Sequence, residues 1–343
     1  MAKEFDVLVF IGRFSPLHLG HEMVIRTALE KADEVVLLIG SAHEARSIRN
    51  PWTFDERCEM IFKAFPNTNN LTVAPLPDFP YDDSKWLAAA RSSVMACAKE
   101  GDRIGLIGHE KDHTSYYLKL FPDWGNVSIK NYEGLNATDV RVDYFTNQQP
   151  EPHGYPAPTP IWPTMVSSNI KKWIDDNPLP KTLIADYFLI EKYKAAWESA
   201  PYPPIFHTTD AVIVQSGHIL LVKRKSSPGM GQWALPGGFL NVNERLEDGM
   251  LRELREETKI KVPEPVLRGS IKGRHVFDAP NRSTRGRTIT TAFFIDLGFD
   301  KKLPKVTGAD DAEKAVWVPL NELDRNVMFE DHFHIIDHFV GVA

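Results

Sequence analysis

The sequence predicts two domains: an α/β domain built on a doubly wound parallel sheet, followed by an α+β domain rich in strands. The chain has 343 residues, which exceeds the usual size of one domain. Apolar runs alternate with helical patterns through its first part, and β-branched or alternating stretches replace them after residue 200. We therefore expect a first domain at 1–198, a linker at 199–206 ("SAPYPPIF") and a second domain at 207–343.

The first domain is predicted from four apolar runs, each separated from the next by a helix or a turn. Strands are expected at 5–11, 33–40, 71–77 and 102–108, and helices at 21–32 and 84–100. Continuous apolar strands joined in this way are typical of a parallel sheet covered on both faces. Ligands then bind at the carboxyl ends of the strands, where the turns at 12–21, 40–53 and 77–86 would gather.

The boundary between the domains is less sharply marked. The proline-rich stretch at 148–163 is either a linker or a surface loop, because the helical patterns at 167–176 and 184–199 still look like helices packed on the first domain. Beyond them, strands are expected at 208–224 and 287–297, with a single helical interval at 243–258. We therefore place the boundary near residue 200.

Composition excludes several classes of protein. The net charge is −6 and no segment concentrates basic residues, which argues against a nucleic-acid partner. Two cysteines, Cys58 and Cys97, cannot form a disulfide framework, so a reducing compartment is expected. There is no signal-peptide pattern and no apolar run of about 18 residues, so we expect a cytoplasmic protein without membrane contact. Homo-oligomerisation is left open.

The turn after the first strand, "GRFSPLHLGH" at 12–21, carries an arginine and two histidines. His18 and His21 are three residues apart, so both imidazoles lie around the first turn of a helix that begins near Leu19. Unpaired N–H groups at such a helix start attract phosphate, and Arg13 adds further donors. The alternative is that the glycines make the turn and the histidines only cap the helix.

This segment resembles the HxGH signature of the nucleotidyltransferase superfamily, and "GRFSP" is similar to archaeal-type nicotinamide-mononucleotide adenylyltransferases. The stretches "GSAHEARSIRNPWTFDER" (40–57) and "LNATDVR" (135–141) resemble later elements of that family, with Asn136 where serine is usual. The stretch at 108–124 is similar to its bifunctional branch. The resemblance implies that a mononucleotide phosphate attacks the α-phosphate of ATP, giving a dinucleotide and pyrophosphate.

The resemblance also implies residue roles. His18, His21 and Arg141 would bind the phosphates of ATP during catalysis. Trp86 would stack on the nicotinamide ring, although core packing is the alternative for this side chain, and Asp83 stands where the family has asparagine. The full set expected to bind ATP or the mononucleotide is Gly12, Arg13, Phe14, Ser41, Asn50, Thr53, Arg57, Asp83, Trp86 and Thr138.

A second motif lies at 237–260, "GGFLNVNERLEDGMLRELREETKI". Glu253, Glu256 and Glu257 share one helix face at positions i, i+3 and i+4, which is costly unless a cation neutralises them. Mg²⁺ or Mn²⁺ prefers such oxygen ligands. A solvent-exposed, glutamate-rich helix is the alternative.

The motif resembles the Nudix box, with Lys259 in place of the final glycine. The resemblance implies a metal site of Gly238, Glu253, Glu256 and Glu257, in which Arg252 orients Glu253 and a water attacks phosphorus. Glu313 looks like an additional base, for which Asp310 or Asp311 could substitute. The stretch at 276–295 resembles Nudix hydrolases of ADP-ribose, which implies binding by Arg282, Arg285 and Arg287, although arginines before a strand are often only solubilising.

Together the two resemblances imply an enzyme of NAD metabolism whose substrates are ATP, nicotinamide mononucleotide and ADP-ribose. A Nudix-like sensor in a transcriptional regulator is the first alternative, but the carboxylates are intact and the acidic tail at 330–343 does not suit DNA. A scaffold with one inactive domain is the second alternative.

Overall fold

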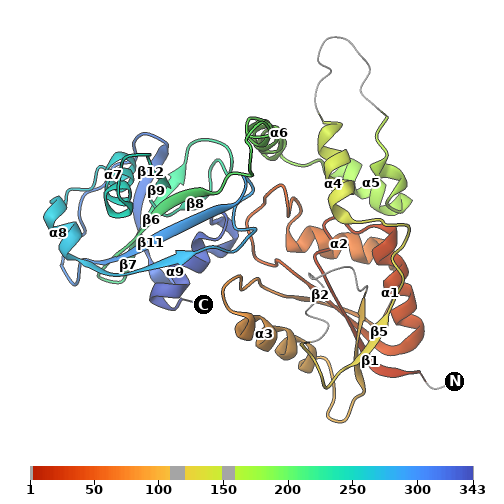
Figure 1. Cartoon of the computed structure of the whole chain (residues 1–343). Helices are drawn as coiled ribbons and strands as arrows, with labels where there is room; N and C mark the ends of the chain where they lie inside the picture. Colours follow the sequence, from red (N-terminus) through yellow and green to blue (C-terminus); the bar gives the residue numbers. More distant parts are fainter. Residues whose placement is uncertain (1–2, 109–119, 149–158, 343) are drawn as a thin grey trace. The chain divides into compact units, whose positions relative to one another are not determined.

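The computed structural model describes residues 3–108, 120–148 and 159–342. The chain forms two compact units, Met1–Pro180 and Lys181–Ala343 (Figure 1). Most of the stretch at 108–124 and of the proline-rich stretch at 148–163 lies outside the described residues. In the part of the chain that the structure describes, no helix is long and apolar enough to cross a bilayer.

The first unit contains a five-stranded sheet in which every strand pair is parallel, in the order β3-β2-β1-β4-β5. This confirms the predicted doubly wound fold. In chain order its elements are β1 (Phe5–Gly12), α1 (Leu19–Lys31), β2 (Ala32–Ile39), α2 (Phe54–Ala64), β3 (Leu71–Pro75), α3 (Asp83–Met95), β4 (Ile104–Gly108), β5 (Gly125–Ser128), α4 (Ala137–Thr146), a 3-10 turn (Trp162–Thr164) and α5 (Ser168–Asp176).

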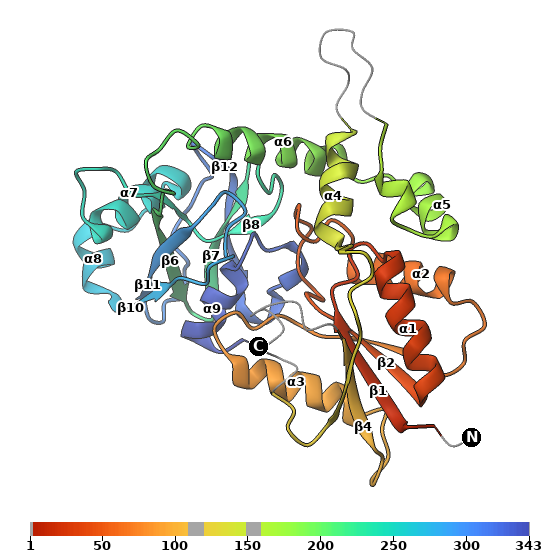
Figure 2. The same ribbon diagram turned by 45° about the vertical axis from the view of Figure 1, so that its right-hand side comes forward.

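Helices cover both faces of this sheet, as Figure 2 shows for α1 and α3. Alternate residues of β1 point to opposite faces, so Val7 and Val9 pack in one core cluster with Val94 of α3. On the other face, the Phe10 ring lies 6.1 Å from the His21 ring of α1. The strand order reverses between β1 and β4, which is where ligands bind in open α/β sheets.

The second unit is built on a mixed sheet in the order β10-β11-β6-β7-β12, with β8 paired to β7 and β9 to β6. Its β6–β11 pair is parallel, while the other pairs are antiparallel. The elements are α6 (Lys181–Ala195), β6 (Phe206–Gln215), β7 (His218–Arg224), β8 (Trp233–Ala234), β9 (Gly237–Phe239), α7 (Leu246–Thr258), α8 (Glu264–Gly269), β10 (Ile271–Phe277), β11 (Thr288–Asp296), β12 (Ala312–Pro319), 3-10 turns (Leu320–Glu322, Arg325–Val327) and α9 (His332–Val340).

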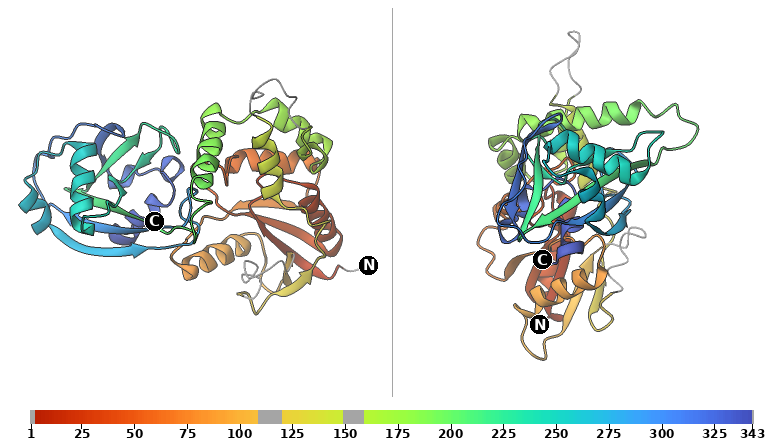
Figure 3. Two further views of the ribbon diagram at one scale, coloured as in Figure 1. Left: turned by 45° about the horizontal axis from the view of Figure 1, so that its top comes forward. Right: turned by 90° about the vertical axis from the view of Figure 1, so that its left-hand side faces the viewer.

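Two helices enclose the mixed sheet from opposite faces, α7 and α9 (Figure 3). Leu254 of α7 packs in one core cluster with Phe293 of β11, whereas the ring of Phe294, the next residue, stacks on Phe339 of α9 at 5.5 Å. The expectation of a single helical interval in this half was wrong. The helices α8 and α9 are short, and histidines alternate with the apolar residues of α9. Neither segment therefore shows the repeating pattern of apolar residues that predicts a helix from sequence.

The helix α6 falls in the second unit, although we expected it to pack on the first domain. The Asp186 carboxylate accepts a hydrogen bond from the Gly229 N–H at 3.0 Å. The ring of Tyr193, in the last turn of α6, lies 5.5 Å from the ring of Phe206. The ring of Trp197, just after the helix, lies 5.3 Å from the same ring. Aromatic side chains of the helical stretch at 184–199 therefore pack within the second unit.

Lys259 closes α7 in the left-handed conformation, with φ 47° and ψ 32°. A side chain in this region costs about 1 kcal/mol, whereas glycine adopts it freely. We therefore expect Lys259→Gly to raise the free energy of unfolding of this unit by about 1 kcal/mol. Native-state hydrogen exchange of the buried α7 amides measures that change.

The matched control is Lys261→Gly, because Lys261 is not among the residues with positive φ. There the added backbone freedom of glycine in the unfolded chain should lower stability or leave it unchanged. Equal effects of the two substitutions would show that the backbone of Lys259 is not strained.

Candidate active sites

The first candidate site begins at the turn between β1 and α1. His18 is the N-cap of α1, and its Nδ1 accepts a hydrogen bond from the His21 N–H at 3.3 Å. The two imidazole rings stack with centroids 3.6 Å apart, and His18 is buried. Since Nδ1 is an acceptor, neutral His18 carries its proton on Nε2. The prediction that α1 begins at Leu19, with both histidines around its first turn, is confirmed.

Glycines and an aromatic ring hold this histidine pair. A Cβ at Gly12 would lie 3.0 Å from the Phe14 ring, and one at Gly20 would lie 3.1 Å from the His18 imidazole. Phe14 is buried at φ 50°, with its ring 4.9 Å from that of His21. Phe14 and Gly12 therefore shape the turn, and the buried ring of Phe14 backs the imidazoles.

Arg141, on α4, joins the same turn. Its Nη1 donates to the Ser15 carbonyl at 2.6 Å and its Nη2 to Thr138 Oγ1 at 3.1 Å. Asn136 caps α4, accepting from the N–H groups of Thr138 (3.0 Å) and Asp139 (3.1 Å). An asparagine in place of the expected serine thus keeps the cap.

Positive charge gathers around Arg141. Burial, together with the charges of Arg13 and Arg49, lowers the pKa of its guanidinium to about 9. Such repulsion between cations is relieved when an anion binds among them. The site is therefore suited to a polyphosphate. Sequence reasoning did not identify Arg49, because a lone loop arginine carries no pattern.

Arg57 supports the loops, and its side chain is only 1% exposed. The side chain is buried and donates to the carbonyls of Arg13 (2.8 Å), Gly40 (2.7 Å), Ser41 (3.0 Å) and Thr53 (3.2 Å). Five donors in a fixed fork suit this task. Arg57 therefore ties together the turns that follow β1 and β2.

Of the other predicted residues in this loop, Thr53 and Ser41 make hydrogen bonds within the protein, whereas Asn50 has an oxygen that a ligand could use. Thr53 and Glu56 form a capping box on α2, which occupies the Thr53 hydroxyl. Ser41 has φ 50° and its N–H donates to Asp78 Oδ1 at 3.2 Å. The side-chain oxygen of Asn50 is buried, and no described group donates to it. An orphan acceptor of this kind fits a ligand donor.

Asp83 and Trp86 lie at the start of α3. Asp83 is exposed, and Trp86 is half-buried against the core cluster of the first unit, with its ring 6.5 Å from that of Phe121. Trp86 therefore packs against the core, and its stacking on a nicotinamide ring stays a prediction.

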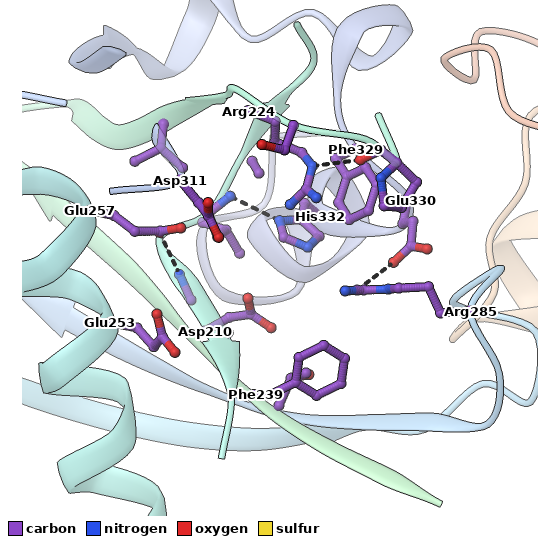
Figure 4. A pocket seen from close by; sticks show the side chains of 18 of the residues that line it. Asp210, Arg224, Phe239, Glu253, Glu257, Arg285, Asp311, Phe329, Glu330 and His332 are labelled. Atoms are coloured by element: carbon purple, nitrogen blue, oxygen red, sulfur yellow. Dashed lines mark hydrogen bonds and ion pairs between the residues drawn. The ribbon is translucent and has the colours of Figure 1, made fainter. Parts of the chain in front are cut away.

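The second candidate site is a pocket of about 400 Å³ in the second unit (Figure 4). It has an acidic end on α7 and β9 and a basic, aromatic end near the start of α9. The lining residues used below are Asp210, Arg224, Gly238, Phe239, Arg252, Glu253, Glu257, Arg282, Arg285, Asp311, Phe329 and His332.

The glycine pair brings the backbone against the carboxylates. Glu257 Oε2 accepts from the Gly237 N–H at 3.0 Å. A Cβ at Gly238 would lie 2.5 Å from Glu253 Oε1, so only glycine fits there. The motif therefore brings Gly238, Glu253 and Glu257 together at one end of the pocket, and their binding of a metal stays a prediction.

Arg252 holds the remaining carboxylates. It pairs bidentately with Glu244 (3.0 and 2.7 Å) and donates to Glu253 at 2.8 Å and to Glu256 at 3.0 Å. Glu256 is not among the residues that line the pocket. Among the described residues, no group of three or more His, Cys, Asp or Glu side chains lies in metal-binding geometry.

The acidic end nevertheless fits a divalent cation. Burial, together with repulsion by Glu253 and Asp210, raises the pKa of Glu257 to about 8 against the opposing hydrogen bond from the Gly237 N–H. Burial also raises the pKa of Glu253, and it raises that of Asp210 to about 6. The pKa values stay raised although Arg252 pairs with Glu253, so the nearby arginines only partly offset the burial of these carboxylates, and a hard cation would stabilise their ionised form.

The opposite end carries arginines held on aromatic rings. The Arg224 guanidinium lies 4.0 Å over the Phe329 ring, and Arg285 lies 5.0 Å from the Phe239 ring. Arg282 is buried in a bidentate pair with Asp331, at 2.9 and 2.8 Å. The predicted Arg282 and Arg285 thus line the pocket, with Arg282 already neutralised.

His332 lies between these arginines. It is buried, and its Nδ1 accepts from the Leu235 N–H at 2.8 Å. Burial, reinforced by Arg282, Arg224 and Arg285, lowers its pKa well below the usual value. His332 is therefore neutral, with its proton on Nε2, and can donate one hydrogen bond.

Two predicted residues lie outside this pocket. Glu313 is exposed and pairs with Lys223 at 3.3 Å, and Arg287 donates to the Asp278 carbonyl. Asp311, one of the two acids that could substitute for Glu313, does line the pocket. Sequence reasoning missed Asp210, Arg224, Phe329 and His332, because each lies in a strand or tail without a motif.

The fold and the two sites define the class of protein: a nucleotidyltransferase-type domain followed by a Nudix domain. The NUDIX domain family matches residues 206–339, and the cytidylyltransferase-like family matches residues 9–78. The chain is 40% identical to nicotinamide/nicotinic acid mononucleotide adenylyltransferase of Acinetobacter baylyi, over 41% of this chain and 77% of that protein. It is 35% identical to ADP-ribose pyrophosphatase of Methanocaldococcus jannaschii, over 38% of this chain and 70% of that protein.

Two solved structures of one protein cover both units. The bifunctional NMN adenylyltransferase/ADP ribose pyrophosphatase of Francisella tularensis, complexed with AMP and a Mn ion, is 34% identical with a TM-score of 0.87, over 98% of each chain. The same protein in a second structure gives 35% identity and a TM-score of 0.88, over 99% of this chain and 100% of that one. The chain belongs to this family of bifunctional adenylyltransferase/Nudix proteins.

Proposed function

We propose that the chain catalyses two reactions: adenylyl transfer from ATP to nicotinamide mononucleotide, and metal-dependent hydrolysis of ADP-ribose. The observation that carries the proposal is that each unit gathers its own set of side chains whose chemistry suits phosphate groups. The first set consists of histidines and arginines, and the second pairs buried carboxylates with arginines on aromatic rings.

In the first reaction, a mononucleotide phosphate oxygen forms a bond to the α-phosphorus of ATP while the bond to the β-phosphate breaks. Pyrophosphate leaves and the dinucleotide remains. His18, through Nε2–H, and His21 stabilise the charge that develops on the transferring phosphoryl group, and Arg13 and Arg141 hold the leaving phosphates. No covalent intermediate is required, so alignment and charge stabilisation carry the catalysis.

In the second reaction, a water attacks one phosphorus of the diphosphate, one P–O–P bond breaks, and AMP and ribose 5-phosphate leave. Glu253, Glu257 and the Gly238 carbonyl would hold a divalent cation, Mg²⁺ or Mn²⁺, and Glu256 would join them only by leaving its ion pair with Arg252. When bound, the cation supplies Lewis-acid activation of the diphosphate and of the water. Asp311 replaces Glu313 as our candidate for the additional base, and Arg285 and His332 donate to the substrate.

The test is product analysis. The purified chain is incubated with ATP and either the amidated or the acid mononucleotide, and separately with ADP-ribose, in Mg²⁺, in Mn²⁺ or after chelation. We expect dinucleotide and pyrophosphate from the first mixture, and AMP and ribose 5-phosphate from the second only when the cation is present. Absence of either pair of products at every metal condition would refute that half of the proposal.

The alternative of a ligand-sensing regulator is not favoured. The described residues keep the carboxylates, their arginine and the pocket together, as hydrolysis requires. The match to a bifunctional protein over almost the whole chain supports two enzymes in one chain.

A further inference from the structure

The helix α6 lies before the residues matched by the NUDIX domain family, which begin at 206. It nevertheless belongs to the second unit and carries a buried carboxylate, Asp186, only 8% exposed. No cation pairs with Asp186 among the described residues, and its Oδ1 is buried without a hydrogen-bond partner there. A buried polar group with so few partners is costly, so the one hydrogen bond that the Asp186 carboxyl group makes calls for an explanation.

That hydrogen bond fixes the loop at 225–232 between β7 and β8. Asp186 Oδ2 accepts from the Gly229 N–H at 3.0 Å. Gly229 has φ +77°, and a Cβ there would lie 2.4 Å from the Phe329 ring. The backbone of Gly229 therefore lies in close contact with both α6 and that ring. The two ends of this loop are joined by a hydrogen bond from the Arg224 N–H to the Gln232 carbonyl at 2.9 Å.

The loop in turn fixes a wall of the pocket. Ser226, Ser227 and Pro228 line it directly. The Pro228 carbonyl accepts from Arg224 Nε at 2.9 Å, which orients the guanidinium that lies over Phe329. A chain of contacts thus runs from Asp186 through Gly229 and Pro228 to the basic end of the pocket.

We propose that Asp186 is a positioning residue of the hydrolase site: through the Gly229 amide it holds the loop that lines the pocket and orients Arg224. The inference rests on the proposed ADP-ribose hydrolysis. It means that α6, which precedes the residues matched by the NUDIX family, is part of the domain that hydrolysis requires. Among the described residues, the hydrogen bond of Asp186 leads to the basic end of the pocket and not to the acidic end, so its loss should weaken substrate binding more than the chemical step.

The experiment compares Asp186→Leu, Asp186→Asn and Glu191→Leu in the full chain. Asparagine keeps an acceptor for the Gly229 N–H, leucine removes it, and Glu191 is an exposed residue of the same helix. For Asp186→Leu we expect the KM for ADP-ribose to rise about tenfold with kcat within about twofold, the equivalent of one lost hydrogen bond. The other two variants should stay within about threefold of the parent KM.

Two readouts separate positioning from unfolding. Hydrogen exchange at the Gly229 amide should speed up about tenfold in Asp186→Leu and remain near the parent rate in Asp186→Asn. Adenylyl transfer should be unchanged in all three variants. An unchanged KM or Gly229 exchange rate in Asp186→Leu, or equal loss in the asparagine variant, would overturn the inference. The exchange measurement needs no substrate, so a parent chain that fails to hydrolyse ADP-ribose refutes only the proposed function.

Discussion

Glu257→Gln should lower ADP-ribose hydrolysis by at least about 10²-fold while leaving dinucleotide synthesis at the parent rate. Glutamine keeps the size of the side chain and can still accept from the Gly237 N–H, but it removes the negative charge that a divalent cation requires at the acidic end of the pocket. The change should appear in kcat and in the metal concentration that gives half-maximal rate.

Two further substitutions on α7 serve as controls. Glu247→Gln removes a carboxylate from the first turn of α7, where it pairs with Arg268 at 2.7 Å outside the pocket, and should leave hydrolysis unchanged. Glu256→Gln should have an intermediate effect, because Glu256 is held by Arg252 outside the pocket lining. A Glu257→Gln variant that hydrolyses ADP-ribose at the parent rate would refute the ligand assignment.

His18→Ala should lower dinucleotide synthesis by about 10²- to 10³-fold and leave hydrolysis of ADP-ribose intact. The substitution removes the Nε2 donor and also the cap that accepts from the His21 N–H. Loss of the cap alone costs about 1 kcal/mol of helix stability. The rates of NAD formation and of AMP release from the same preparation measure both expectations.

His18→Asn separates the two roles of this residue. Asparagine caps helices well, so the stability of α1 should be close to that of the parent. It cannot place a donor where the imidazole Nε2 lies, so synthesis should remain as low as in the alanine variant. Recovery of synthesis in His18→Asn would mean that the histidine acts only as a cap, the alternative that the sequence left open.

The parts of the account that were predictable from sequence lie in local motifs. His18 and His21 are three residues apart at a strand-to-helix turn, and Gly238, Glu253 and Glu257 share one strand-turn-helix segment. In both cases backbone geometry over a few residues decides which side chains meet. The alternation of apolar runs and helices likewise predicted the parallel sheet.

The residues that could not be predicted depend on contacts distant in sequence. His332 accepts a hydrogen bond from Leu235, 97 positions away in the sequence. Arg57 donates hydrogen bonds to carbonyls up to 44 residues away. The choice between Asp311 and Glu313 depends on a register shift in β12 between Ala312 and Lys314. An irregularity of this kind changes which side chains face the pocket, and the sequence carries no sign of it.

Crystals soaked with an adenine nucleotide and Mn²⁺ test the central claim most directly, since anomalous scattering locates the metal without reference to activity. The account predicts a Mn²⁺ peak bounded by Glu253, Glu257 and the Gly238 carbonyl, and separate phosphate density beside His18, His21 and Arg141. Metal bound away from α7 together with no phosphate at the start of α1 would contradict it.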